Sequence, residues 1–215
     1  AEALPESVKK AIYLDCDTVI IGSLKPMWET PLAGCLLGMI LEPTAYEKIR
    51  NVIGLTMDDA YYNAGVLLMD LEGFRRENIQ AKLLQFYADK GGNLFACDQD
   101  VINGTLKGRI KTLPPQFNFA TNYWYFNYAT LRGMSASYEE ITREQFEAAR
   151  RRPVVIHYMG DERPWIAGNR NRFRKYYDVY LSRTTWRGRP KEKGTALYMA
   201  RERLMELTEA GCHTL

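Results

Sequence analysis

Short apolar runs alternate along the chain with longer segments whose apolar residues recur every three or four positions. The short runs predict strands, and the most continuous suit strands covered on both faces; they lie at residues 11–22, 35–41, 66–69, 109–113 and 153–158. The periodic or capped segments predict helices at residues 5–10, 74–88, 98–106, 142–150, 169–181 and 195–210. This order of strands and helices predicts an α/β fold, with residues 46–55 readable as helix or loop.

Two carboxylates, Asp15 and Asp17, interrupt the apolar run at residues 11–22. Because strand side chains alternate between two faces, both should point to one side, where a divalent cation could bind. A carboxylate in an apolar setting is costly unless it is paired or metal-bound, and no cationic residue is adjacent. Two other interpretations stay open: the aspartates accept turn hydrogen bonds at the end of the strand, or they belong to a phosphohydrolase of the Asp-x-Asp-x-Thr type. Val19 stands where that type has threonine, which argues against the phosphohydrolase.

With 215 residues, 46% of them hydrophobic, the chain is long enough for one well-packed domain and short for two. Its four cysteines form no Cys-x-x-Cys pair, which argues against a zinc ribbon or a dense disulfide scaffold and favours a reducing, cytoplasmic setting. No apolar run approaches the roughly eighteen residues of a spanning helix, and residues 1–10 lack the apolar core of a signal peptide. The sequence therefore predicts a soluble or peripheral protein.

The net charge of +3 is concentrated toward the C-terminus, since residues 163–193 carry ten Lys or Arg and two acids. Aromatic residues are interleaved with these charges. Such a pattern occurs in nucleic-acid binding, in contact with anionic membrane surfaces, and on solvated faces whose aromatics pack inward. No recognisable nucleic-acid module accompanies the charge, so no nucleic acid is expected as a partner.

The predicted strand at residues 153–158 brings His157, one of two histidines, to its end. A single histidine after an apolar strand is more often a buried core residue than a metal ligand. Gly160 and Arg163 shift that balance, because a glycine can free backbone N–H groups and a nearby arginine can grip an anionic oxygen such as that of a diphosphate. Asp98, by contrast, reads first as a complement to the dipole of the helix that it opens.

Four segments stand out: YLDCD at residues 13–17, YNAGVLL at 62–68, DQDVIN at 98–103 and HYMGDERPW at 157–165. In this order and with this spacing, they resemble glycosyltransferase family 8, the group of the lipooligosaccharide galactosyltransferases and glycogenin. The resemblance implies a GT-A fold, with a mixed central sheet flanked by helices, and transfer of a sugar from a UDP-sugar with retention of anomeric configuration. It also implies that Asp15, Asp17 and His157 bind Mn²⁺, with Mg²⁺ as the other candidate, and that the metal bridges the donor diphosphate.

By the same resemblance, the residues that contact the donor are Cys16, Asn63, Asp98, Gln99, Gly160 and Arg163. Asp98 would hold hydroxyls of the sugar and Gln99 would lie near the reacting carbon, so these two are the expected catalytic residues. Lysine is usual in the family where Arg163 stands, and the wider, planar guanidinium needs a different pose. Because an amide is a poor nucleophile, we favour attack of the acceptor hydroxyl from the leaving-group side.

The family has an N-terminal strand and helix before the Asp-x-Asp strand that hold much of the nucleoside, whereas this chain begins fourteen residues before Asp15. We therefore expect a fragment of a longer protein; an incomplete nucleotide site is the other interpretation. Residues 1–168 would be a catalytic GT-A portion that lacks its N-terminal βαβ part. Residues 169–215 would be a basic, aromatic helical segment.

The expected activity is transfer of glucose or galactose to a glycan or glycolipid acceptor in the synthesis of cell-surface polysaccharide or lipopolysaccharide. The aromatic loop at residues 117–128 would face the acceptor or else pack in the interior. Residues 169–215 would give peripheral contact with the inner face of a membrane. The alternative is a catalytically silent protein, either a sugar-nucleotide binder or a partner subunit.

Overall fold

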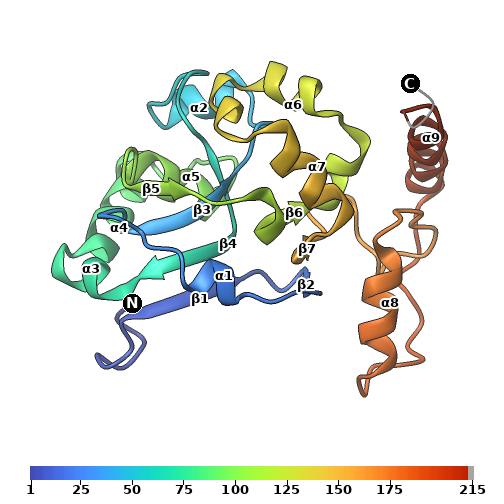
Figure 1. The fold of residues 1–215 in the computed structure, drawn as a ribbon, viewed down its shortest axis with the longest axis horizontal. Coiled ribbons are helices and arrows are strands. Elements are labelled where there is room, and N and C mark those ends of the chain that lie inside the picture. The colour runs from blue at the N-terminus through green and yellow to red at the C-terminus, as the bar shows by residue number, and fades with distance from the viewer. Residues whose placement is uncertain (213–215) are drawn as a thin grey trace.

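The computed structural model describes residues 1–212, with side chains as far as residue 207, and places the strands of that part in two mixed sheets (Figure 1). The larger sheet has the order β1–β4–β3–β5 and consists of β1 (Lys10–Leu14), β4 (Tyr62–Asp70), β3 (Leu37–Leu41) and β5 (Ile110–Thr112). The smaller sheet has the order β2–β7–β6 and consists of β2 (Thr18–Ile20), β7 (Val155–His157) and β6 (Phe119–Ala120). Each sheet contains one parallel pair, β3 with β5 and β6 with β7. The predicted α/β fold is confirmed.

Helices surround the two sheets. They are α1 (Lys25–Trp28), α2 (Glu47–Val52), α3 (Leu71–Arg76), α4 (Ile79–Asp89), α5 (Cys97–Thr105), α6 (Tyr128–Met134), α7 (Arg143–Arg151), α8 (Arg174–Ser182) and α9 (Ala196–Cys212). Short 3-10 helices occur as η1 (Pro115–Asn118), η2 (Thr121–Tyr125) and η3 (Ala136–Glu140). Figure 1 shows α3 and α4 at one end of the larger sheet and α8 and α9 at the opposite end of the molecule, beyond β2 and β7.

The main core joins β3 and β4 to the smaller sheet and to α7. All five residues of β3 are buried, as its continuous apolar run predicts. Phe119, Phe146 and Tyr158 contribute large side chains that are each about 1% exposed. Helix α7 begins with the predicted capping box, in which Thr142 and Gln145 exchange hydrogen bonds of 2.8 and 3.1 Å between side chain and backbone.

The prediction of one strand over residues 11–22 is wrong. The chain leaves the larger sheet after Leu14 and enters the smaller sheet at Thr18. A turn separates the two strands because the N–H and the hydroxyl of Thr18 both donate to the carbonyl of Asp15, at 3.2 and 2.7 Å. Asp15 and Asp17 therefore lie on the link between the sheets, with side chains 36% and 29% exposed rather than deeply buried.

Two helix predictions also need correction. Residues 5–10 form turns and the start of β1, and the guanidinium of Arg75 binds carbonyls of this region, those of Ala1, Leu4, Pro5 and Val8. Arg75 thus satisfies these carbonyls, which lie outside any helix. The periodic segment at residues 74–88 is divided into α3 and α4 at Asn78, whose φ of 51° lies in the left-handed region that asparagine tolerates.

The segment after β7 packs against the smaller sheet. Phe173 is buried, and its ring lies 5.4 Å from the ring of Phe119 and 5.7 Å from that of Trp124, measured between centroids. The hydroxyl of Tyr180 on α8 donates to the carbonyl of Ile20 on β2 at 2.7 Å. The first residues of this segment are thus part of the core of the molecule.

The helix predicted at residues 195–210 is confirmed as α9, and residues 213–215 of the predicted C-terminal segment lie outside the described part of the chain. Among residues 1–212, none of the helices combines the length and the hydropathy that crossing a bilayer requires. Cys16, Cys35 and Cys97 are free thiols, and the side chain of Cys212 is outside the described part.

Candidate active site

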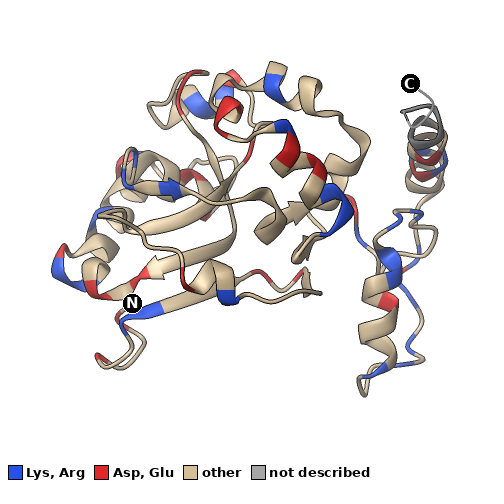
Figure 2. Cartoon of the chain, viewed as in Figure 1, with Lys and Arg blue, Asp and Glu red and all other residues tan. Residues whose placement is uncertain are grey.

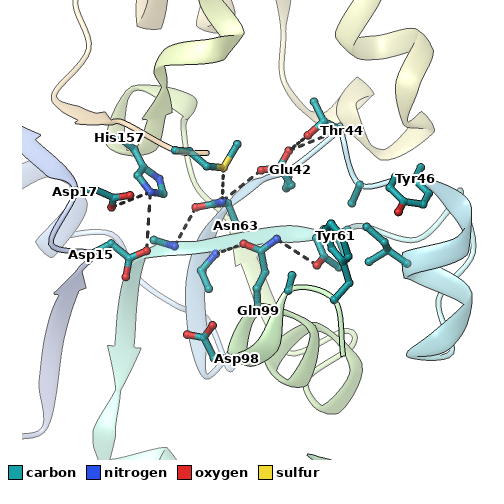
Figure 3. Close-up of a pocket in the computed structure, with 17 residues that line it drawn as sticks. Asp15, Asp17, Glu42, Thr44, Tyr46, Tyr61, Asn63, Asp98, Gln99 and His157 are labelled. Atoms are coloured by element: carbon teal, nitrogen blue, oxygen red, sulfur yellow. Dashed lines mark hydrogen bonds and ion pairs between the residues drawn. The ribbon is translucent and has the colours of Figure 1, made fainter. Parts of the chain in front are cut away.

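Asp15, Asp17 and His157 lie together where the two sheets meet (Figure 3). One ligand atom from each side chain lies within 4.8 Å of the others. The Nε2 atom of His157 is 3.2 Å from Oδ1 of Asp17 and 3.9 Å from Oδ2 of Asp15. The aspartates come from the turn after β1, and β2 pairs with β7 so that Thr18 stands opposite His157. The three predicted metal ligands are therefore close enough to share one ion.

Asn118 orients His157, although it was not among the predicted site residues. Its Oδ1 lies 2.9 Å from Nδ1 of His157, and its Nδ2 donates to Oδ1 of Asn63 at 2.7 Å. Because an amide oxygen only accepts, Nδ1 of the imidazole carries the proton. The neutral ring then turns the lone pair of Nε2 toward Asp17, which is the tautomer that a metal ligand needs.

The charges of this cluster favour a cation between the three side chains. Oδ1 of Asp17 is buried, and its neighbour Nε2 of His157 has no proton to donate in the neutral imidazole. Burial by itself would raise the pKa of Asp17, but without an ion a protonated His157 that donates to Asp17, with a smaller contribution from Arg163, outweighs burial and lowers that pKa. A bound cation would supply the same positive charge while the imidazole stays neutral. Two carboxylates and one imidazole nitrogen are a suitable ligand set for a divalent ion such as Mn²⁺.

Tyr13 holds the second carboxylate in place. Its hydroxyl donates to Oδ1 of Asp15 at 2.6 Å. That hydrogen bond, together with burial and the charge of Asp15, raises the pKa of Tyr13 to about 12. Tyr13 therefore keeps its proton at neutral pH, and Oδ2 of Asp15 remains directed at His157.

Gly65 on β4 leaves the room that His157 needs. A Cβ atom at this position would lie 2.3 Å from Cε1 and 2.7 Å from Nδ1 of the histidine. The carbonyl of Gly65 also accepts from the N–H of Asp15 at 2.8 Å. This glycine therefore permits a close approach between a strand and the candidate ligand.

A cavity of about 430 Å³ adjoins the cluster, a size that suits a small ligand. Three of the residues that we expect to contact the sugar-nucleotide donor line it: Asn63, Asp98 and Gln99. The lining residues that the sequence did not single out include Glu42, Thr44, Tyr46, Tyr61 and Phe95. Figure 3 shows the cavity running from the aspartates and His157 along β4 toward Tyr61 and Tyr46.

Gln99 is fixed against β4 by both ends of its amide. Oε1 accepts from the N–H of Ala64 at 3.0 Å, and Nε2 donates to the hydroxyl of Tyr61 at 3.2 Å. Gln99 and Asn103 both lie on α5. Asn103 also joins this helix to β4, because its amide exchanges hydrogen bonds of 2.8 and 2.7 Å with the backbone of Tyr62. Asp98 precedes Gln99 and is exposed in the cavity wall, so its carboxylate is accessible to a ligand.

Glu42 is a buried carboxylate in the same wall, only 4% exposed. The hydroxyls of Thr44 and Tyr123 donate to its Oε1, and Nδ2 of Asn63 donates to Oε2 at 3.3 Å. These donors compensate the cost of burying the charge. Glu42 was recognisable in the sequence, because a carboxylate directly follows the apolar residues 35–41, just as Asp15 directly follows the apolar residues 11–14.

The other residues that we expect to contact the sugar-nucleotide donor lie outside the lining of this cavity. Cys16 is exposed and borders a neighbouring cavity beside Trp165. Gly160 has a φ of 68°, and its carbonyl accepts from Nε of Arg163 at 2.8 Å. Arg163 is exposed, and its charge contributes to the lowered pKa of Asp17. Residues 160–163 therefore lie near enough to the cluster to influence it.

The aromatic loop at residues 117–128 packs in the interior over most of residues 117–124. Phe117, Tyr123 and Trp124 are at most 8% exposed, and the cavity lining contains none of the loop's residues. Residues 124–128 border a separate cavity beside α7, so contact of this loop with the acceptor stays a prediction. The exposed aromatic residues in the wall of the cavity beside the cluster are instead Tyr46 and Phe95, whose rings lie 6.2 Å apart between centroids.

Replacing Asn118 with leucine (Asn118→Leu) is expected to weaken Mn²⁺ binding by about ten- to a hundredfold, because His157 loses the acceptor that sets its tautomer. Isothermal titration of the protein with Mn²⁺ measures the change. Asn51→Leu, at an exposed position of α2, is the control and should leave metal binding unaltered. Equal metal affinity in the two variants would show that Asn118 does not orient a metal ligand.

The sequence is similar to those of several known bacterial proteins. General stress protein A of Bacillus subtilis is 27% identical over 183 residues, which are 84% of this chain and 61% of that protein. The lipopolysaccharide 1,2-glucosyltransferase of Escherichia coli is 23% identical over 184 residues, which are 84% of this chain and 51% of that protein. The chain thus spans between about half and three fifths of the length of these relatives.

Two solved structures and the family model that match this chain are all of glycosyltransferases. The galactosyltransferase LgtC, solved with donor and acceptor sugar analogues, has a TM-score of 0.70 at 25% identity, over 85% of this chain and 64% of its own. The bifunctional glycosyltransferase WbbM has a TM-score of 0.68 at 20% identity, over 91% of this chain and 35% of its own. These likenesses confirm the expected GT-A type fold. Because the model of glycosyl transferase family 8 matches residues 1–168, the chain belongs to that family.

Proposed function

We propose that this chain carries the donor site of a retaining hexosyltransferase, which moves glucose or galactose from a UDP-sugar to a glycan or glycolipid acceptor. The observation that carries the proposal is the cluster of Asp15, Asp17 and His157 at the edge of a cavity that three predicted donor residues also line. Relatives named as a lipopolysaccharide glucosyltransferase and a galactosyltransferase support a hexose donor and a cell-surface acceptor. The chain spans part of these relatives, so the activity proposed is that of the whole protein.

Asp15, Asp17 and His157 would hold Mn²⁺, or Mg²⁺ in its place, through two carboxylate oxygens and Nε2. When bound, the ion supplies positive charge beside the diphosphate oxygens that become negative as the sugar leaves. The guanidinium of Arg163 would add a second positive charge on the same side, as its influence on Asp17 supports. Because the diphosphate charge grows in the transition state, these contacts accelerate the reaction more than they strengthen donor binding.

Asp98 and Gln99 would position the sugar. The exposed carboxylate of Asp98 can accept hydrogen bonds from sugar hydroxyls. The amide of Gln99 is already engaged with Ala64 and Tyr61, which suits a fixed wall better than a nucleophile. In the reaction that we propose, the bond from the sugar carbon to the diphosphate oxygen breaks while the acceptor oxygen bonds to that carbon from the same face. The departing oxygen takes the acceptor's proton, and a trapped glycosyl adduct on Asp98 or Gln99 would contradict this course.

Release of UDP from UDP-glucose and from UDP-galactose, measured with and without Mn²⁺, tests the proposed activity. We expect release that stops on addition of a chelator and resumes when Mn²⁺ is restored. Release that does not depend on metal would remove the assignment. The alternative, a catalytically silent sugar-nucleotide binder or partner subunit, is supported instead if UDP binds while neither donor is consumed.

We also propose that the C-terminal segment touches the inner, cytoplasmic face of a membrane. Lys and Arg outnumber Asp and Glu on α8 and the loop after it (Figure 2). Large apolar side chains are exposed nearby, among them Trp186 at 55% and Leu197 at 81%. Cationic and aromatic or aliphatic groups together favour anionic lipid surfaces.

Flotation of the whole chain with anionic vesicles tests this contact, comparing wild type with a Trp186→Ser, Leu197→Ser variant. Point variants suit the test better than removal of residues 169–215, because Phe173 belongs to the core. Loss of the variant from the floated fraction is expected. Equal recovery of both proteins with the vesicles would contradict membrane contact through these residues.

A further inference from the structure

Two carboxylates are buried where α9 meets the loop after β7. Glu162 is 0% exposed and Glu202 is 1% exposed. Between them lies Arg201, whose Nη1 is 3.2 Å from Oε1 of Glu162 and 2.9 Å from Oε1 of Glu202. We call these three residues the α9 clasp. Burial, followed by the charge of Glu202, raises the pKa of Glu162, although Arg201 and Asn171 act in the opposite direction.

The remaining carboxylate oxygens of the clasp bind the chain between residues 169 and 171. Oε2 of Glu202 accepts from Nδ2 of Asn169 at 3.1 Å and from the N–H of Arg170 at 2.8 Å. Oε2 of Glu162 accepts from Nδ2 of Asn171 at 2.9 Å. All four oxygens therefore have partners, and the contacts of Glu202 with Asn169 and Arg170 and of Arg201 with Glu162 tie α9 to the segment that follows β7.

The clasp lies directly beside the loop that would meet the donor diphosphate. Glu162 points into the protein, whereas the next residue, Arg163, is exposed and donates from Nε to the carbonyl of Gly160. Fixing the side chain of Glu162 thus fixes the backbone that carries Arg163. Within the part of the chain that the structure describes, the only cation that pairs with Glu162 is Arg201 of α9.

We propose that the α9 clasp is a positioning element of the donor site: by holding Glu162, the C-terminal helix keeps Gly160 and Arg163 where they meet the diphosphate. This inference rests on the proposed function. Its physical basis is that a buried carboxylate which loses its cation is strongly unfavourable, so Glu162 turns toward solvent when Arg201 is removed. The loop at residues 160–163 then loses its anchor while the aspartates and His157 keep their own contacts.

Arg201→Ala in the whole chain tests the proposal, with titration calorimetry of UDP at saturating Mn²⁺ as the main measurement. We expect UDP to bind about ten- to a hundredfold more weakly, as when a residue that orients a ligand group is lost. Arg201→Lys keeps the charge but loses the planar guanidinium that reaches both carboxylates, so it should recover part of the affinity. Arg203→Ala, at an exposed position on the same helix, is the matched control and should bind UDP as wild type does.

A second set of measurements separates positioning from a general loss of structure. Amide hydrogen exchange should accelerate at residues 159–163 in Arg201→Ala and stay unchanged on β3 and β4. The KM for UDP-glucose or UDP-galactose, whichever the wild-type protein consumes, should rise. Should Arg201→Ala fail to fold, Glu202→Gln decides instead: it keeps the volume of the side chain, and a threefold to tenfold loss of UDP affinity is expected.

The outcomes distinguish the clasp from the proposed function. Wild-type protein that binds UDP, together with an Arg201→Ala variant that binds it equally well, would overturn the clasp and leave the proposed function standing. Wild-type protein that binds no UDP in the presence of Mn²⁺ would overturn both. Equal acceleration of exchange across the whole molecule would assign Arg201 to stability and overturn its positioning role.

Discussion

Replacing Asp17 with asparagine (Asp17→Asn) is expected to reduce metal-dependent UDP release by on the order of a thousandfold. Oδ1 of Asp17 is the carboxylate oxygen nearest to Nε2 of His157, at 3.2 Å, so the substitution removes a charged ligand from the centre of the cluster. The shape of the side chain is kept, and the backbone carbonyl of residue 17 still accepts from the N–H of Tyr158. The fold should therefore persist while Mn²⁺ affinity and turnover fall together.

Asp58→Asn is the matched control, since Asp58 is an exposed aspartate that is not part of the cavity lining. Both variants should have circular dichroism spectra like that of wild type. Mn²⁺ titration and UDP release should differ from wild type in Asp17→Asn alone. Full metal dependence and turnover in Asp17→Asn would exclude Asp17 as a ligand and, with it, the metal-based function that we propose.

The sequence predicted the residues of the cluster better than the local structure that holds them. The prediction placed both aspartates on one continuous strand, whereas Thr18 draws the chain into a turn after Asp15. The carboxylates still converge on His157, because the strands on either side of the turn belong to two sheets that meet there. Periodicity could not reveal a change of sheet within this one apolar run, since both strands carry the same pattern.

The polar residues that support the cluster could not be predicted in the same way. Asn118 and His157 are 39 residues apart, and Tyr123 and Glu42 are 81 residues apart. Each pair is joined by side-chain hydrogen bonds that exist only once the sheets, η1 and η2 have packed. Asparagine and tyrosine in an irregular segment give no local signal of such a role, because the same residues are common in ordinary loops.

The C-terminal helix illustrates the same limit for charged residues. An Arg and Glu pair such as Arg201 and Glu202 on a predicted helix reads as part of a solvated face. Glu202 is nevertheless buried, and Arg201 pairs with the buried Glu162, because α9 docks beside the loop after β7, which no periodicity expresses. The capping box at Thr142, by contrast, was predictable because all of its hydrogen bonds are local.

Replacing Gly65 with alanine (Gly65→Ala) is expected to lower turnover by on the order of a hundredfold, since a displacement of about 1 Å at a reacting site has effects of that size. The added methyl group would overlap the imidazole of His157, which is buried and has little room to move. The ring must shift, and its hydrogen bond to Asn118 is strained or lost. Overpacking should also destabilise the fold by about 1 to 3 kcal/mol, which denaturant unfolding measures.

A double-mutant cycle with His157→Ala isolates the cause of that loss. Once the imidazole is removed, the closest remaining neighbour of a Cβ at position 65 is Oδ1 of Asn63 at 3.0 Å. Adding Gly65→Ala to His157→Ala should therefore cost much less stability and Mn²⁺ affinity than Gly65→Ala costs in the wild-type protein. Gly133→Ala on α6 is the control: a Cβ there meets no neighbour within 4 Å, and alanine in a helix should stabilise the fold slightly. Additive effects of the two site substitutions would mean that Gly65 acts on something other than His157. Coupling between them would show that the fit between one strand glycine and the imidazole controls the metal site.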